Sequence, residues 1–134
     1  MGFWRNWGLS RRVLMFDQDA ATARELNREV KKVLHLKIDN SGTIRETIAR
    51  LRTGRYSVAI VDPIWWSVDK GERYELIGEL SKGRRLIAFT ALSEERTGII
   101  MGQLSYTYLQ KPCRTEEVVM EIAEAFLRSQ YKKE

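Results

Sequence analysis

Short apolar runs alternate along the chain with longer segments in which apolar residues recur every three or four positions. The apolar runs predict strands at about 12–16, 34–38, 57–61, 85–89 and 105–109. The longer segments predict helices at about 20–33, 43–53, 70–82, 93–102 and from about 115 to the last residues. Strands that alternate with helices over short connections predict an α/β fold, in which helices cover both faces of a parallel sheet.

The apolar patterns also place individual elements in this fold. The strand at 57–61 is continuously apolar, which is typical of a central parallel strand buried on both faces. The strand at 34–38 alternates and is expected at the sheet edge, in a strand order 2-1-3-4-5. In the helix at 20–33 an apolar stripe is predicted to face the core, and it consists of Ala23, Leu26, Val30 and Val33.

Four of the predicted strands are each followed by a polar residue, namely Asp17, Asp62, Thr90 and Lys111. The carboxyl ends of parallel strands meet at one edge of the sheet, where open α/β folds bind ligands. In the order 2-1-3-4-5 the first and third strands are neighbours, so Asp17 and Asp62 are expected to face each other. Two carboxylates at this distance repel unless a cation such as Mg²⁺ or a shared proton intervenes. The set predicts a site for an anionic group, and a phosphoryl group suits the ammonium and the hydroxyl best.

Composition and charge limit the other classes of function. The chain has 134 residues, a net charge of +5 and a single cysteine, Cys113, so it forms no internal disulfide. We expect one domain over residues 11–131, preceded by a loosely ordered basic and aromatic leader at 1–10. There is no stretch of about 18 apolar residues and no signal-peptide pattern, so we expect a cytoplasmic protein without a membrane span. Basic and acidic residues are mixed, as in Arg24-Glu25 and Arg28-Glu29, which argues against direct nucleic-acid binding.

The segments around the strand ends resemble the receiver domain of two-component response regulators. The resemblance covers about residues 11–130, and its matching segments are 13–19, 58–62, 89–91 and 108–112. It implies a flavodoxin-like, doubly wound (βα)5 three-layer sandwich with the strand order 2-1-3-4-5. It also implies a signalling domain rather than an enzyme.

The resemblance assigns a role to each polar residue at the sheet edge. By position, Asp62 would accept a phosphoryl group from a histidine kinase or a phosphotransfer protein. Thr90 and Tyr108 would rearrange on phosphorylation, and Lys111 would contact the phosphoryl group, with its bond to Pro112 commonly cis in the family. The output would be contact with a downstream protein or a homodimer, through the face formed by the fourth helix, the fifth strand and the fifth helix.

The metal site implied by the resemblance departs from the family pattern. It would consist of Asp17, Asp62 and the backbone carbonyl of Ile64, together with a second acid directly after Asp17. Gln18 occupies that position, and its amide oxygen can coordinate Mg²⁺ without bringing a charge. The loss of one charge near the ion costs up to about 4 kcal/mol at 4 Å and an effective dielectric constant of 20. We therefore expect weak Mg²⁺ binding, unless Asp19 acts as a substitute.

Three hypotheses about function remain open. In the first, the domain is a receiver phosphorylated on Asp62. In the second, it is a pseudo-receiver that serves as a docking or dimerisation module without phosphorylation. In the third, Asp17-Gln18-Asp19 is the motif of a haloacid-dehalogenase-type phosphatase with Asp17 as nucleophile, although Ala21 stands where that family has Thr or Val, and Asp62 is left without a role.

Overall fold

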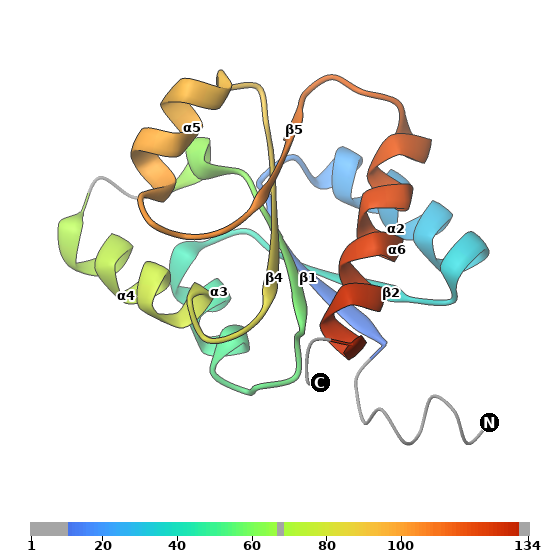
Figure 1. The fold of residues 1–134 in the computed structure, drawn as a ribbon, viewed down its shortest axis with the longest axis horizontal. Coiled ribbons are helices and arrows are strands. Elements are labelled where there is room, and N and C mark those ends of the chain that lie inside the picture. Colours follow the sequence, from blue (N-terminus) through green and yellow to red (C-terminus); the bar gives the residue numbers. More distant parts are fainter. Residues whose placement is uncertain (1–10, 67–68, 132–134) are drawn as a thin grey trace.

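A parallel five-stranded sheet forms the centre of the computed structural model, which describes residues 11–66 and 69–131 (Figure 1). The strands are β1 (Arg12–Phe16), β2 (Lys37–Ser41), β3 (Val58–Val61), β4 (Arg85–Thr90) and β5 (Thr107–Gln110). Their order is β2-β1-β3-β4-β5, and all neighbours are parallel. The predicted strand order is confirmed, while the predicted leader at 1–10 lies outside the described residues.

Helices cover both faces of the sheet, as the sequence predicts for a three-layer sandwich. They are α2 (Ala20–Leu34), α3 (Ile44–Leu51), the 3₁₀ turn η1 (Pro63–Trp65), α4 (Lys70–Leu80), α5 (Glu94–Met101) and α6 (Thr115–Tyr131). Figure 1 shows α2 and α6 on one face and α3, α4 and α5 on the other. Within the described residues, no helix is long and apolar enough to span a membrane.

Each central strand contributes to two separate cores, because successive side chains point to opposite faces of a sheet. In β1, Val13 and Met15 pack under α2 and α6, whereas Leu14 and Phe16 pack under the helices of the other face. All four side chains are at most 1% exposed. This two-sided burial explains why the strands are continuously apolar, and why the first polar residue after each strand falls at the edge of the sheet.

The second strand lies three residues later than its predicted position at 34–38. The helix α2 continues through Leu34 and ends at His35, which adopts the left-handed conformation (φ 56°) and donates its backbone N–H to the carbonyls of Lys31 and Val30. The apolar stripe of α2 therefore ends on Leu34, which packs against the core, whereas Val33 is 55% exposed. The prediction for Val33 is wrong, because a spacing of four rather than three returns the helix to its buried face.

Candidate functional site

The two carboxylates predicted to face each other do so at the carboxyl ends of β1 and β3. In the register of these strands Phe16 pairs with Val61, and the backbone N–H of Asp62 donates to the carbonyl of Phe16 at 3.2 Å. Asp17 is 1% exposed and Asp62 3%. Two buried carboxylates at one sheet edge require a compensating positive charge.

That charge is supplied by Lys111, which follows β5. Its Nζ donates to Asp17 Oδ2 at 2.7 Å and to Asp62 Oδ2 at 2.9 Å, and it lies 5.1 Å from the centre of the Phe89 ring. Burial alone would lower the pKa of Lys111, but the hydrogen bonds to the two carboxylates outweigh burial and raise it. The peptide bond from Lys111 to Pro112 is cis. One ammonium therefore faces two carboxyl groups at this site.

Backbone N–H groups orient the remaining oxygen of each carboxylate. Asp17 Oδ1 accepts the N–H of Asp19 at 2.8 Å, and Asp62 Oδ1 accepts the N–H of Ile64 at 3.2 Å. In both cases the donor lies two residues further on, the geometry by which aspartate side chains stabilise tight turns. The site is therefore fixed by the chain itself, with an ammonium on one side and backbone donors on the other.

The two other polar residues of the β1–α2 loop have partners outside this pair of acids. Gln18 donates its side-chain amide to the carbonyl of Gly42 at 3.1 Å. Asp19 is the N-cap of α2, and it accepts the backbone N–H of Thr22 at 3.3 Å and its hydroxyl at 2.7 Å. These hydrogen bonds from Thr22 lower the pKa of Asp19. Asp19 is thus engaged in starting a helix, a role that competes with service as a substitute metal ligand.

The oxygen atoms at this edge fit a Mg²⁺ ion held by few charges. Asp17 and Asp62 supply carboxylates, Ile64 a backbone carbonyl and Gln18 an amide oxygen, and all of these are ligand types that Mg²⁺ accepts. The described part of the chain nevertheless contains no group of three or more His, Cys, Asp or Glu side chains placed to hold a metal ion. Lys111 already neutralises one of the two acids, so the chemistry favours a weak site.

Thr90 and Tyr108 meet at one residue of the loop between β4 and α5. The Thr90 hydroxyl, which is fully buried, accepts the backbone N–H of Leu92 at 3.2 Å. The Tyr108 hydroxyl donates to the backbone carbonyl of the same Leu92 at 2.5 Å. Burial of the phenol, followed by the nearby charge of Glu94, raises the pKa of Tyr108, which keeps the hydroxyl a donor. The two residues are therefore connected through a single peptide segment.

A further hydroxyl at this edge escapes the analysis of the sequence. Ser41 ends β2 and is fully buried; its hydroxyl shares a 2.7 Å hydrogen bond with Thr47, and its carbonyl accepts the N–H of Asp17 at 3.3 Å. The polar residues that follow Ile38 are the signal that would have found it. A second strand predicted at 34–38 leaves them in a loop instead.

Comparison with known proteins adds evidence about the fold. No protein-family model and no curated protein sequence matches the chain. Solved structures do match it. A CheY-like response regulator receiver domain from Methanospirillum hungatei JF-1 is 20% identical over 95% of this chain and 100% of its own, with a TM-score of 0.72. The receiver domain of the Francisella response regulator 1452 is 21% identical over 88% and 98%, with a TM-score of 0.71.

The fold is that of a response regulator receiver domain. A two-component response regulator from Clostridium difficile gives a similar result, with 16% identity over 87% of this chain and 96% of its own and a TM-score of 0.69. At these identities the comparison establishes the receiver fold, while the roles of Asp62, Lys111 and the other site residues depend on their own geometry.

Proposed function

We propose that the chain is a receiver domain that accepts a phosphoryl group on Asp62 from a histidine kinase or a phosphotransfer protein. The observation that carries the proposal is the double contact of Lys111 with Asp17 and Asp62 at the carboxyl edge of the sheet. A carboxylate oxygen of Asp62 would attack the phosphorus of a phosphohistidine. The P–N bond breaks, its electron pair stays on the imidazole nitrogen, and an acyl phosphate forms on Asp62.

The residues around Asp62 support this chemistry in separate ways. Lys111 is already hydrogen-bonded to the acceptor carboxylate, so its ammonium is placed to pair with phosphoryl oxygens once they arrive. Mg²⁺ would be held by Asp17, Asp62 and the carbonyl of Ile64, with Gln18 as a neutral fourth donor, and would neutralise phosphoryl charge when bound. Since no catalytic turnover is needed beyond transfer and loss of the phosphoryl group, we propose a signalling domain of the cytoplasm rather than an enzyme.

The hydrogen bonds of Leu92 connect Thr90, at the site, with Tyr108, so a change at the site can alter the position of Tyr108. A Thr90 hydroxyl that turns toward a phosphoryl group on Asp62 would give up its bond to the Leu92 N–H. The carbonyl of the same residue holds Tyr108, so a shift of this segment would also reposition that ring and the start of α5. We propose that the face formed by α5, β5 and α6 changes partners in this way, toward a downstream protein or a second copy of the chain.

A second candidate is a pseudo-receiver that docks partners without being phosphorylated. The observation that favours it is Gln18, which is neutral where the resemblance implies an acid and whose amide is hydrogen-bonded to Gly42. Both candidates use the same fold and the same outer face. They differ in whether the site responds to a phosphoryl group.

The deciding experiment is ¹⁵N NMR of the protein with BeF₃⁻ and millimolar Mg²⁺, and with a small phosphodonor. The phosphorylation proposal expects shifts at Asp62, Thr90, Leu92 and Tyr108, all abolished by Asp62→Asn. An unchanged spectrum in the wild type, together with a response in Gln18→Asp, would establish the pseudo-receiver. Turnover of p-nitrophenyl phosphate that is lost in Asp17→Asn but kept in Asp62→Asn would instead support the phosphatase hypothesis.

A further inference from the structure

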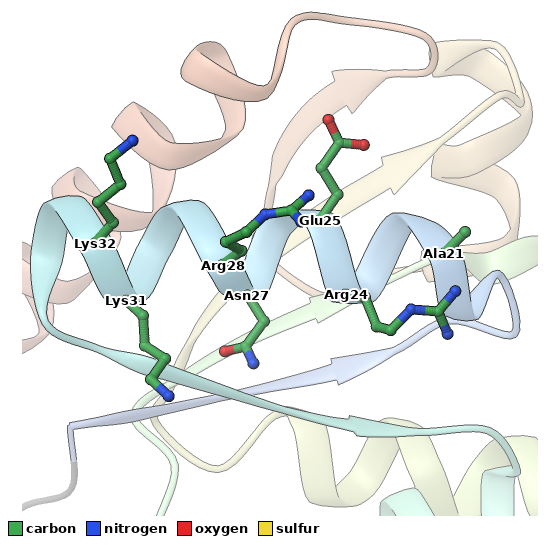
Figure 2. A pocket seen from close by; sticks show the side chains of 7 residues that line it. All are labelled: Ala21, Arg24, Glu25, Asn27, Arg28, Lys31 and Lys32. Atoms are coloured by element: carbon green, nitrogen blue, oxygen red, sulfur yellow. The ribbon is translucent and has the colours of Figure 1, made fainter.

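The outer face of α2 carries four exposed basic side chains that form no ion pair with any other described residue. They are Arg24, Arg28, Lys31 and Lys32, and Figure 2 shows their side chains along one helix. All four line an open hollow of about 750 Å³. Among the residues that line this hollow, only Glu25 is acidic. We call these four residues the α2 basic row.

The helix separates most of these cations from their acidic neighbours in the sequence. At 3.6 residues per turn, Arg24, Arg28 and Lys31 fall within about 60° of one another around the axis, while Lys32 falls about 20° from Glu25, which lies about 100° from Arg24. Glu25 accepts a hydrogen bond from the Thr115 hydroxyl of α6 at 3.4 Å. Three of the four cations, Arg24, Arg28 and Lys31, therefore lie together on one side of α2, while Lys32 lies beside Glu25.

Several arginines elsewhere in the described residues pair with acids across helices, whereas others, such as Arg55 and Arg96, form no ion pair, like those of α2. On the other face of the sheet, Arg45 contacts Glu72 and Glu75 of α4, and Arg52 contacts Glu75 and Glu79. These contacts show that the fold pairs cations across helices where acids are placed for it. Among the described residues, no acid of another helix forms such an ion pair with the α2 basic row, although Glu25 of α2 itself lines the same hollow.

Helix stability does not account for the whole row. Lys31 and Lys32 lie in the last turn of α2, where cations interact favourably with the helix dipole. Arg24 and Arg28 lie earlier, in a helix whose first turn contains no acid. Like charges four residues apart, such as Arg24 with Arg28, destabilise a helix. An anionic partner would relieve this repulsion.

We propose that the α2 basic row binds the phosphate backbone of a nucleic acid, without reading its sequence. From Arg24 to Lys31 the row spans about 10 Å at 1.5 Å per residue. Phosphates of one strand follow each other about every 3.4 Å along a duplex axis, so the row faces about three of them. Arginine guanidinium groups, with their planar forks of donors, match phosphate oxygens well.

The surroundings of the row favour nucleic acid over the other polyanions. A helix that inserts into a membrane surface needs a free apolar face, whereas Ala23, Leu26 and Val30 of α2 are buried in the core. Protein interfaces are centred on aromatic and apolar anchors, and the hollow is lined by charged residues, one amide and one alanine. Protein–nucleic acid interfaces are more polar and more positively charged, as this face is.

The test compares two variants with the same change in net charge. One reverses three residues of the row (Arg24→Glu, Arg28→Glu, Lys31→Glu). The matched control reverses three exposed cations elsewhere that also form no ion pair with a described residue (Arg55→Glu, Arg96→Glu, Lys70→Glu). Binding is measured by fluorescence anisotropy of a labelled duplex of about 20 base pairs, between about 50 and 200 mM salt. Circular dichroism verifies that both variants are folded.

We expect the wild type to bind with a slope of log K against log salt of about −2.7, the value for three phosphate contacts. Reversal of the row should weaken binding at least tenfold more than the control does, and should flatten the slope. Equal losses in both variants would show that net charge alone is responsible and would overturn the proposal. So would no binding of the duplex at low salt, or binding only to vesicles of phosphatidylglycerol. Asp62→Asn should leave duplex binding unchanged, which keeps this test separate from the phosphorylation proposal.

Discussion

Lys111 and Asp17 are 94 residues apart in the chain, yet the lysine Nζ lies 2.7 Å from Asp17 Oδ2. The contact joins the end of β5 to the end of β1, two strands that are not neighbours in the sheet. Lys111 therefore crosses the ends of β4 and β3 to reach its partner, and it contacts Asp62 as well. One ammonium thus pairs with both acids at this edge of the sheet, and several expected effects depend on this contact.

Replacement of Lys111 by Met should destabilise the protein. The change leaves Asp17 and Asp62 without their ammonium, and breaking a buried ion pair costs about 3–5 kcal/mol. We expect about 2–3 kcal/mol, because Lys111 keeps 20% of its side chain exposed and solvent screens part of the charge. Urea unfolding in EDTA measures the loss, and millimolar Mg²⁺ should restore part of it. Lys70→Met, at an exposed position of α4, is the control, and a loss insensitive to Mg²⁺ would contradict the expected metal site.

Replacement of Gln18 by Asp should strengthen Mg²⁺ binding at least tenfold. The new carboxylate adds one charge near the ion, worth up to about 4 kcal/mol at 4 Å and an effective dielectric constant of 20. The variant also loses the hydrogen bond from Gln18 to Gly42, which offsets part of that gain. Isothermal titration calorimetry measures the dissociation constants. Gln103→Asp makes the same change in charge at an exposed position between α5 and β5. Equal affinities in both variants would argue against Gln18 as a metal-site residue.

Replacement of Tyr108 by Phe should remove one hydrogen bond and keep the packing of the ring. The expected loss of stability is about 0.5–1.5 kcal/mol, the usual net value of such a bond. The amide resonance of Leu92 should shift, because its carbonyl loses the donor at 2.5 Å. Tyr106→Phe is the matched control, since no hydrogen bond of its hydroxyl occurs among the described residues. An unshifted Leu92 would mean that the tyrosine does not hold this loop in solution.

The stability that Asp39 contributes to the fold should decrease as the pH falls. Burial raises the pKa of Asp39, but hydrogen bonds from Tyr56 at 2.6 Å and Arg12 at 2.8 Å outweigh burial and lower it. Because its pKa is lower in the folded than in the unfolded state, ionised Asp39 stabilises the fold at any pH above its unfolded-state pKa of about 3.9. This stabilisation is lost as the pH falls through the pKa of the folded state. Asp39→Asn should cost about 1–3 kcal/mol at about pH 7. Urea unfolding should show this difference shrinking below about pH 3.9, and a constant difference would contradict the assignment.

The sequence predicts the fold well where strands are buried on both faces. Runs such as 58–61 and 86–89 are apolar because helices cover them twice, so the pattern alone locates them and the polar residues that follow. It fails at the edge strand β2, whose only large apolar residue is Ile38. The start of β2 depends on where α2 ends, at His35. The alternating pattern of a short polar strand does not reveal where that helix ends.

The sequence likewise predicts some contacts of the candidate site and misses others. The approach of Asp17, Asp62 and Lys111 follows from the strand order, which the sequence predicts. The partners of Gln18 and Asp19 do not, because they depend on where the β2–α3 loop and the first turn of α2 lie in space. The α2 basic row is also not predicted from the order of residues, since the helical period is what brings Arg24, Arg28 and Lys31 to one side of α2.

The β1–α2 loop has three consecutive side chains with three different partners. Asp17 contacts Lys111, Gln18 contacts the carbonyl of Gly42, and Asp19 contacts Thr22. The loop is therefore already ordered by the protein, and a cation that arrives there competes with existing hydrogen bonds instead of organising a loose segment. Exchange of the ion should then be fast, and occupancy of the site should follow the surrounding Mg²⁺ concentration from moment to moment.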